Sequence, residues 1–505
     1  MLALSFPKFG HPAFAWFALT PLIIALVRRR TNAELSLSTR KAFGLGLVAG
    51  GVYFSVTLYW LVETMTTFGG LSSPVAVLAA FLLVAYLSLF PAMCAVVVSR
   101  CARAMGPAAA LLAAPAWVAT ELGRQYVWDG FPWELLGYSQ IRWLGIAQLA
   151  SVTGVYGLSF LLALTAAAAA YVITKKDRRS IATAVATVAI VTSCAAWGHA
   201  RLRAASLLST GAPVRVAVLQ ANIPQGDKWN PGLADAITTR YIDMTRQALA
   251  SGATFIIWPE SSTPFYFEQD LLRGSAIRRL AVEGKATLLI GSDQVEPVRA
   301  EPNRQKPDDR VYNAAFVIRP DGRTGAVYRK MHLVPFGEYV PAQRLLFFVG
   351  PIVEAVSAFV PGTEAVLLPV GEHRASTAIC YEVIFASLMR QFVASGSELL
   401  TTITNDAWYG TSSAPYQHWD QAAMRSIENG RYLARAANTG ISGFVDPYGR
   451  VIEKSALFTQ GLFVADLRFI TANTIYTRAG DVIAWASLAM TVAALLATAR
   501  VRYNQ

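Results

Sequence analysis

The sequence predicts a bundle of membrane-spanning α-helices joined to one α/β domain, on the basis of its composition, its hydropathy pattern and an alternation of strands and helices. Of the 505 residues, 54% are hydrophobic and only 15% are charged, whereas soluble proteins average about 25% charged residues. The apolar residues are concentrated at the two ends of the chain, and the middle has an ordinary globular composition. We therefore expect an N-terminal transmembrane bundle over residues 1–200, an α/β domain over 213–472 and a C-terminal transmembrane helix over 480–500.

Long apolar segments, each bounded by polar residues, are the candidates for crossing the membrane. A helix needs about 20 apolar residues to span the hydrocarbon core, because lipid offers no partner to an unpaired backbone amide. The candidate segments are 12–27, 42–62, 74–99, 106–122, 144–173, 180–200 and 482–499. An uncleaved signal anchor over 1–27 is an alternative for the first of them. However, Pro7, Gly10 and Pro12 interrupt this stretch as a loop between two spans would, so we expect that a further helix precedes Met1.

The distribution of basic residues between these segments predicts the orientation of the chain, because Lys and Arg are retained on the cytoplasmic side. Basic residues follow the first, third, fifth and last segments: Arg28, Arg29, Arg30, Arg40, Lys41, Arg100, Arg103, Lys175, Lys176, Arg178, Arg179, Arg500 and Arg502. The intervening loops, 63–73 and 123–143, contain only Arg124 and Arg142. This alternation places the α/β domain on the outer face. It also accounts for much of the net charge of +12, so we expect no nucleic-acid partner.

The cysteines indicate neither a metal site nor an intradomain disulfide. They are Cys94, Cys101, Cys194 and Cys380, with no CxxC or Cys/His spacing of the kind that holds zinc or an iron-sulfur cluster. The first three lie in or beside apolar segments, where cysteine is usually a small buried residue. Cys380 is the only cysteine of the α/β domain, and we expect neither a metal nor a cofactor.

Short β-rich runs alternate with helical and turn-rich stretches in the middle of the chain. The expected strands are 214–223, 253–260, 286–293, 311–318, 376–383, 399–406 and 440–447. Regular helical patterns cover 234–250 and 417–436, and the turn sequences PDGR at 320–323 and DPYGR at 446–450 indicate hairpins. Strands interleaved with helices predict a layered α/β fold.

Reactive side chains lie at the ends of three strands. Glu260 lies in WPESS, Lys330 and Glu338 lie in YRKMHLVPFGEYVP, and Cys380 lies in AICYE. Taken alone, Glu260 can be interpreted as a helix-start carboxylate, Lys330 as a solvated charge and Cys380 as a packed thiol. Together they specify thiol attack on an acyl carbon. Glu260 would take the thiol proton as general base, and the Lys330 ammonium, with a backbone amide after the nucleophile, would stabilise the oxyanion. Glu338 would hold Lys330 or assist the base.

These motifs in this order resemble the Glu, Lys, Cys triad of the nitrilase, or carbon-nitrogen hydrolase, superfamily. The helices at both ends make the chain similar to the membrane-bound branch of that superfamily, the apolipoprotein N-acyltransferases. Further matching stretches are FPWELLGYSQ at 131–140, PQGDKWNP around Trp229, PFGEYVP, NDAWYG at 405–410 and TRAGD at 477–481. The resemblance implies a nitrilase-like αββα sandwich, with Glu260 as base, Lys330 on the oxyanion and Cys380 as nucleophile. It also implies functional positions at Glu338, Trp229, Tyr381 and Glu382. We expect Trp408 to line the pocket, with aromatic core packing as the alternative.

The resemblance further implies a multi-pass enzyme of the bacterial inner membrane, surrounded by membrane lipids, with its catalytic domain in the periplasm. Members of that family move a fatty acyl chain from a phospholipid acyl donor, through a cysteine thioester, to a diacylated lipoprotein acceptor, namely the α-amino group of its N-terminal diacylglyceryl-cysteine. The chain departs from the family at its N-terminus, where one more helix is expected. The triad itself is unaffected by that departure.

A nearly uncharged run from Leu345 to Val360 separates the lysine and cysteine motifs and is too short to span a membrane. We interpret it as a membrane-dipping arm that admits acyl chains, with a buried core helix as the alternative. Aspartate in place of Phe347 and Phe348 should then reduce acylation without unfolding the domain.

Two other functions remain open at this point. One is a membrane-anchored amidase or nitrilase that hydrolyses a small amide, and the other is a non-catalytic membrane scaffold or transporter.

Overall fold

The computed structural model describes the chain except residues 9, 29–36, 298–308, 336, 340–358 and 504–505. The chain forms two compact units. The helical unit comprises Met1–Thr66, Ser72–Ala204 and Thr474–Gln505, and the α/β unit comprises Thr67–Leu71 and Ala205–Asn473. The predicted class, a membrane helical region plus an α/β domain, is confirmed. The proposed arm at Leu345 to Val360, with Phe347 and Phe348, lies almost entirely outside the described residues.

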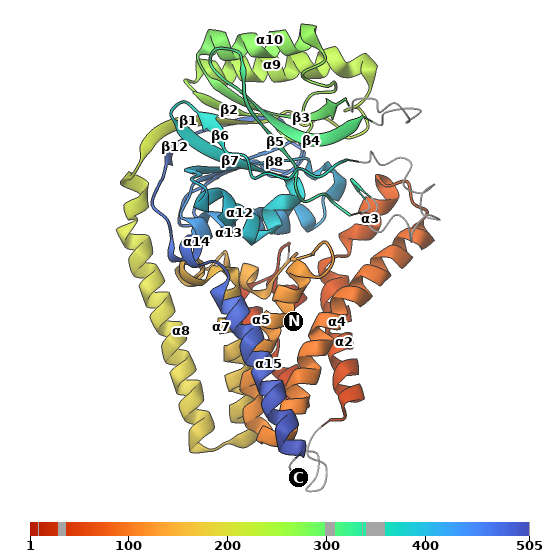
Figure 1. Ribbon diagram of the computed structural model, residues 1–505, viewed down its shortest axis with the longest axis vertical. Coiled ribbons are helices and arrows are strands. Elements are labelled where there is room, and N and C mark those ends of the chain that lie inside the picture. The colour runs from red at the N-terminus through yellow and green to blue at the C-terminus, as the bar shows by residue number, and fades with distance from the viewer. Residues whose placement is uncertain (9, 29–36, 298–308, 336, 340–358, 504–505) are drawn as a thin grey trace, which may run out of the picture. The chain divides into compact units, whose positions relative to one another are not determined.

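The helical unit consists of apolar helices separated by short connections (Figure 1). Its α-helices are α1 (Thr20–Val27), α2 (Thr39–Thr57), α3 (Trp60–Thr67), α4 (Ser73–Met105), α5 (Ala113–Tyr126), α6 (Leu144–Ala147), α7 (Ala150–Lys175), α8 (Arg178–Ala204), α14 (Ile475–Ala479) and α15 (Val482–Tyr503). The 3₁₀ segment η3 (Gly106–Leu112) links α4 and α5. Two of the predicted segments, 74–99 and 106–122, therefore belong to one apolar stretch.

Four helical stretches among the described residues are long and apolar enough to cross a membrane. They are Ser73–Tyr126, Ala150–Lys175, Arg178–Ser209 and Val482–Arg500. The helices α2 and α3 would make a fifth span if the pair, bent by 52°, is one broken span. The apolar stretch Pro12–Val27 is shorter than the others. The number of crossings in the complete bundle therefore stays a prediction.

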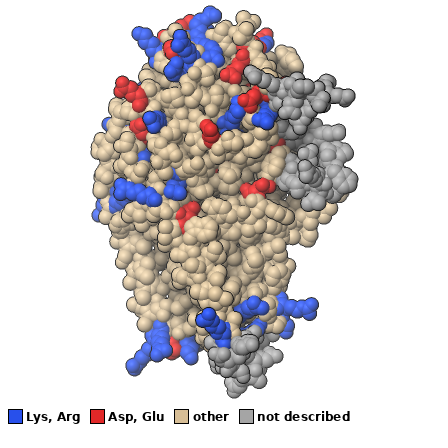
Figure 2. Space-filling view, viewed as in Figure 1, with Lys and Arg blue, Asp and Glu red and all other residues tan. Residues whose placement is uncertain are grey.

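The helical unit exposes apolar side chains of the kind that lipid would cover. Val48, Phe81 and Val185 are 65%, 63% and 63% exposed, which would be costly in water over so large an area. The space-filling view shows few charged side chains over the middle of this unit, with Lys and Arg gathered at one end (Figure 2). Lys175, Lys176, Arg178 and Arg179 are among the exposed basic residues. This pattern supports the assignment of these helices to a membrane.

The α/β unit contains two six-stranded mixed sheets. The first has the order β12-β1-β2-β3-β4-β5 and the second has the order β11-β10-β9-β8-β7-β6. The strands are β1 (Ala212–Gln220), β2 (Phe255–Ile257), β3 (Thr287–Glu296), β4 (Arg310–Ile318), β5 (Thr324–Arg329), β6 (Leu368–Val370), β7 (His373–Ile379), β8 (Leu399–Thr404), β9 (Leu433–Ala437), β10 (Gly443–Val445), β11 (Val451–Lys454) and β12 (Gly461–Phe469). In each sheet the three central strands, β1 to β3 and β7 to β9, are parallel.

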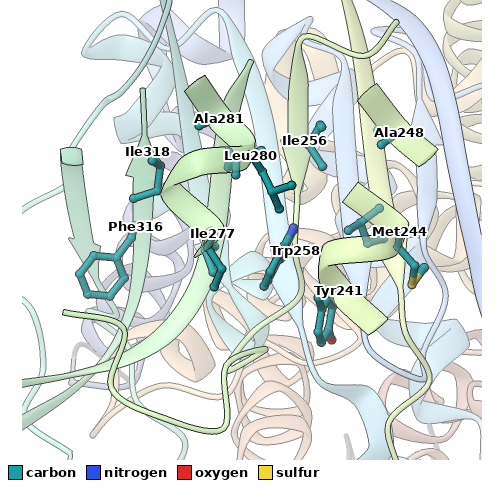
Figure 3. Close-up of a cluster of buried hydrophobic side chains, with 14 of the residues drawn as sticks. Tyr241, Met244, Ala248, Ile256, Trp258, Ile277, Leu280, Ala281, Phe316 and Ile318 are labelled. Carbon is teal, nitrogen blue, oxygen red and sulfur yellow. The ribbon is translucent and has the colours of Figure 1, made fainter. Parts of the chain in front are cut away.

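Helices cover the outer face of each sheet, which gives the four layers of an αββα sandwich (Figure 1). The first sheet is covered by α9 (Ala234–Ala250) and α10 (Leu271–Gly284), and the second by α12 (Ala386–Ala394) and α13 (Ala414–Asn429). Figure 3 shows the core between the first sheet and its helices, where Trp258 stacks on Tyr241 at 4.7 Å between ring centroids. The indole Nε1 of Trp258 also donates to Thr245 Oγ1 at 3.0 Å. This packing fixes the strand end that carries Glu260.

Each of the seven expected strands overlaps an observed strand, but one expected helix extends too far and several strands were missed. The expected hairpins at PDGR and DPYGR join β4 to β5 and β10 to β11. The expected helix over 417–436 is wrong over residues 430–436, because α13 ends at Asn429 and residues 433–437 form β9. Gly430, at φ 63°, ends the helix in a left-handed conformation that glycine adopts without strain. The sequence pattern also missed β5, β6, β9, β11 and β12 as strands.

Candidate active site

The predicted catalytic side chains lie where strands of the two sheets end. Glu260 follows β2, Lys330 directly follows β5, and Cys380 directly follows β7. Asn405 and Asp406 directly follow β8, the parallel neighbour of β7. In open α/β sheets the carboxyl ends of parallel strands are the usual place for ligands. The architecture therefore brings together groups that are far apart in the sequence.

Glu260, Lys330 and Glu338 form a buried ionic cluster. Lys330 Nζ lies 3.3 Å from Glu260 Oε1 and 2.8 Å from Glu338 Oε1, and its side chain is 1% exposed. Asn313 Nδ2, on β4, donates to the same two oxygens at 2.7 and 2.9 Å. Glu338 Oε2 accepts from the backbone N of Val334 at 2.8 Å. One ammonium and one amide thus hold two carboxylates in a fixed position.

The other side of Glu260 is held equally firmly. Its Oε2 accepts from the backbone N of Asn405 at 2.9 Å, and its carbonyl oxygen accepts from Lys228 Nζ at 3.0 Å. The next residue, Ser261, has φ 42°, and its hydroxyl donates to Asp293 Oδ1 at 3.0 Å. Lys228 is buried. Three separate segments of the chain therefore aim the carboxylate of Glu260, and a fourth, at Lys228, holds its backbone carbonyl.

Cys380 occupies a strained turn of the backbone. Its φ is 53°, in the left-handed region that few residues other than glycine adopt. Cys380 directly follows β7 and is the first residue of the short helix η8 (Cys380–Ile384). Such strain is concentrated at functional sites, because only a strongly held surrounding structure maintains it. A sharp strand-to-helix turn also projects the side chain of a nucleophile clear of its neighbours.

Opposing charges set the protonation of the three groups. Burial by itself raises the pKa of Glu260, but the ammonium groups of Lys330 and Lys228 outweigh it and hold that pKa below its ordinary value. Burial lowers the pKa of Lys330, yet Glu338 and Glu260 raise it above its ordinary value. Burial and the Glu260 charge raise the pKa of the Cys380 thiol, while Lys330 opposes them. At neutral pH the site therefore contains a carboxylate, an ammonium and a protonated thiol.

Glu382 ties the cysteine turn to the segment that follows Lys330. Its Oε2 accepts from the backbone N of Ile379 at 2.7 Å. Its Oε1 accepts from Tyr328 Oη at 2.7 Å and from the backbone N atoms of Met331 and His332 at 2.6 and 3.1 Å. Burial raises the pKa of Glu382 to about 7, against these hydrogen bonds, which lower it. This carboxylate is thus a structural link between the nucleophile and the lysine.

The remaining predicted residues are Tyr381, Trp229 and Trp408. Tyr381 is 4% exposed and packs edge-on against Phe385 at 5.3 Å. Trp229 and Trp408 are 46% and 37% exposed. Partly exposed tryptophans of this kind have a face available for an apolar ligand. Among the described residues no group of three or more His, Cys, Asp or Glu side chains is placed to hold a metal ion.

Comparison with known proteins connects this geometry to a family. The model of the apolipoprotein N-acyltransferase N-terminal domain matches residues 1–168, and the carbon-nitrogen hydrolase model matches residues 215–475. An apolipoprotein N-acyltransferase of Geobacter metallireducens is 38% identical over 97% of this chain and 91% of its own length. The chain belongs to the apolipoprotein N-acyltransferase family. The protein of that name from Methylococcus capsulatus is 33% identical over 95% of this chain and 91% of its own length.

Membership in the apolipoprotein N-acyltransferase family makes the chain a membrane-bound acyltransferase of the carbon-nitrogen hydrolase superfamily. This confirms the resemblance inferred from the motifs. A solved structure of the Nesterenkonia AN1 amidase from the nitrilase superfamily is also similar, with 22% identity, a TM-score of 0.38 and coverage of 52% of this chain and 93% of that chain.

Sequence reasoning missed several groups that hold the cluster, namely Lys228, Asn313, Asn405 and Asp293, and it also missed Asp406 beside Cys380. Three signals were available. Lys228 adjoins Trp229 in PQGDKWNP, and Asn405 and Asp406 open NDAWYG. Asn313 lies inside the buried strand β4, where an amide is unusual unless it has partners.

Proposed function

We propose that this apolipoprotein N-acyltransferase uses Glu260, Lys330 and Cys380 as its catalytic triad. The acyl donor is a phospholipid, and the acceptor is the α-amino group of the diacylglyceryl-cysteine that begins a diacylated lipoprotein. Cys380 carries the acyl group between them as a thioester. The reaction needs no metal and no cofactor.

In the first half-reaction Glu260 takes the proton from Cys380 as Sγ attacks the ester carbonyl of the phospholipid. Negative charge develops on the carbonyl oxygen, where the Lys330 ammonium and the backbone N–H of Tyr381 stabilise it. The C–O bond then breaks, and Glu260 returns the proton to the departing alcohol. The products are a thioester on Cys380 and a lysophospholipid.

In the second half-reaction the α-amine of the acceptor attacks the thioester. The same donors stabilise the oxyanion, and Glu260 receives a proton from the nitrogen and delivers it to the departing Sγ. An amide bond forms, the C–S bond breaks, and the free thiol is restored. Glu338 keeps Lys330 in place throughout, and Glu382 keeps the lysine segment against the cysteine turn. Trp229, Trp408 and Tyr381 contact the acyl chains.

The observation that carries this proposal is the strained Cys380, placed at a strand end within reach of the charges of Glu260 and Lys330. A buried thiol with a raised pKa is inert unless a base removes its proton at the moment of attack. Glu260, ionised at neutral pH, is such a base. The ammonium of Lys330 is already in place for the negative charge that follows.

Purified protein incubated with phosphatidylethanolamine should gain the mass of one fatty acyl group, and Cys380→Ala should gain none. Cys194→Ala is the matched control, because Cys194 lies on α8 in the helical unit, and it should behave as wild type. A diacylated lipopeptide should discharge the adduct, while water alone should not. An adduct that persists in Cys380→Ala would refute the assignment of the nucleophile, and rapid discharge by water would favour the anchored amidase.

We further propose that residues 1–200 and 480–500 anchor the enzyme in the bacterial inner membrane, with residues 213–472 as a catalytic domain in the periplasm. Support comes from the basic loops, in which Lys175, Lys176, Arg178 and Arg179 lie between α7 and α8. Such residues are retained in the cytoplasm. The α/β domain begins after α8 and so lies on the opposite side.

Single cysteines in a cysteine-free Cys380→Ala background should report this orientation. A cysteine at Glu283, exposed on α10, should react with a membrane-impermeant maleimide in spheroplasts. A cysteine at Arg178, exposed at the start of α8, should react only after the membrane is permeabilised. The reverse pattern would place the catalytic domain in the cytoplasm.

A further inference from the structure

A buried polar network beside Cys380 has no part in the mechanism above. It consists of His418 on α13, Asp406 after β8 and Arg435 on β9, whose side chains are all 0% exposed. Arg435 donates to Asp406 Oδ2 at 2.8 Å, and Asp406 Oδ1 accepts from Thr404 Oγ1 at 2.8 Å. The cost of burying these groups is substantial, so their arrangement requires an explanation beyond packing.

The network reaches the backbone of the nucleophile. His418 Nε2 lies 3.1 Å from the carbonyl oxygen of Cys380. A carbonyl oxygen can only accept a hydrogen bond, so Nε2 must carry a proton. His418 Nδ1 lies 3.0 Å from Asp406 Oδ1 and 2.9 Å from the terminal nitrogen of Arg435. Burial and the Arg435 charge lower the pKa of His418, which favours a neutral ring with its proton on Nε2.

The carbonyl that His418 holds belongs to Cys380, the residue with the left-handed backbone. A residue other than glycine in the left-handed region is strained, and it persists only where the surrounding structure determines it. In the described structure the carbonyl of Glu260 is held in a similar way, by Lys228, directly before the left-handed Ser261. Both catalytic strand ends thus have a buried side-chain donor on the carbonyl of the reacting residue.

We propose that His418 is a positioning residue for the nucleophile. Its Nε2–H fixes the carbonyl of Cys380 and so holds the left-handed turn that presents Sγ to Glu260 and Lys330. Arg435, held by Asp406, donates to Nδ1 and fixes the ring plane of His418. The proposal rests on the proposed function of Cys380 as the nucleophile.

The test compares His418→Gln with His418→Asn. The two amides have the same polarity, but glutamine places its NH₂ near the position of Nε2, whereas asparagine reaches only the position of Nδ1. Wild type and both variants are given phosphatidylethanolamine, and the rate of acyl-enzyme formation is measured by intact mass over a range of lipid concentrations. We expect His418→Gln to acylate within about 10-fold of wild type, and His418→Asn to be slowed about 100-fold, the typical effect of a 1 Å misplacement. KM for the lipid should be unchanged in both.

The outcomes separate the proposals. If wild type forms no acyl-enzyme, the proposed function itself fails. If wild type acylates and the two variants have equal rates, or His418→Asn is the faster, His418 only anchors α13 and the positioning role is refuted.

The protonation state of the His418 ring gives a second test, which needs no His418 variant. In protein labelled with ¹⁵N-histidine, with the four other histidines changed to glutamine, the ring spectrum should show a proton on Nε2, and a proton on Nδ1 alone would overturn the proposal.

Discussion

Glu260→Gln should lower the rate of acyl-enzyme formation by about 10³- to 10⁴-fold, at the upper end of what general acid–base catalysis contributes. The reason is the raised pKa of the Cys380 thiol, which leaves the sulfur protonated unless a base accepts its proton during attack. Glutamine preserves the size of the side chain and keeps an oxygen for Asn313 or Asn405, but its amide has no useful basicity. The rate is measured by intact mass with phosphatidylethanolamine in excess.

Glu283→Gln is the matched control for this change, because Glu283 is an exposed carboxylate on α10. It should acylate at the wild-type rate. KM for the lipid should change little in Glu260→Gln, since Glu260 acts on the proton and not on the acyl chain. A loss of less than 10-fold in Glu260→Gln would assign the base to another group.

Lys330→Met should remove both activity and stability. Loss of one oxyanion donor typically costs about 10²- to 10³-fold in rate. Removal of one partner from a buried ion pair typically costs about 3–5 kcal/mol, because it leaves uncompensated charge in the interior. Here that charge belongs to Glu260 and Glu338, whose side chains are 8% and 12% exposed. The acylation rate and the thermal unfolding midpoint in detergent measure the two effects.

The stability loss in Lys330→Met should depend on pH in a defined direction. In wild type the pKa of Glu260 is lowered on folding, so its carboxylate contributes stability above its unfolded pKa and loses that contribution as the pH falls through the folded pKa. Without Lys330 the folded pKa of Glu260 rises, so protonation of Glu260 relieves its repulsion with the Glu338 carboxylate. The deficit relative to wild type should therefore be larger at pH 8 than at pH 5.

Lys285→Met is a suitable control, because Lys285 is an exposed residue just after α10. Its midpoint should lie close to that of wild type at both pH values, as expected for a surface charge. A deficit of Lys330→Met that is the same at pH 8 and pH 5 would show that the lysine does not compensate the two carboxylates.

The sequence alone determined the class of the protein and the residue types of its chemistry. Backbone groups in lipid must be hydrogen-bonded within the spanning segment itself, so a span is one continuous apolar helix. Apolar runs about 20 residues long therefore identify membrane helices. Glu260, Lys330 and Cys380 were recognisable as candidates because each lies in a short motif, namely WPESS, YRKMHLVPFGEYVP and AICYE. The hairpin turns were equally local, since Gly322 and Gly449 supply the positive φ that these turns require.

Only the tertiary structure decided how the reacting groups are held. The contact between the backbone of Asn405 and Glu260 joins residues 145 positions apart, and that between His418 and Cys380 joins residues 38 apart. No local pattern encodes such pairs, because the order of the strands in the two sheets determines which residues meet. The same is true of β9, where tertiary pairing with β8 and β10 overrode a helical pattern. Local periodicity therefore specified the elements and the reactive side chains, while the packing of the two sheets determined their positions and protonation states.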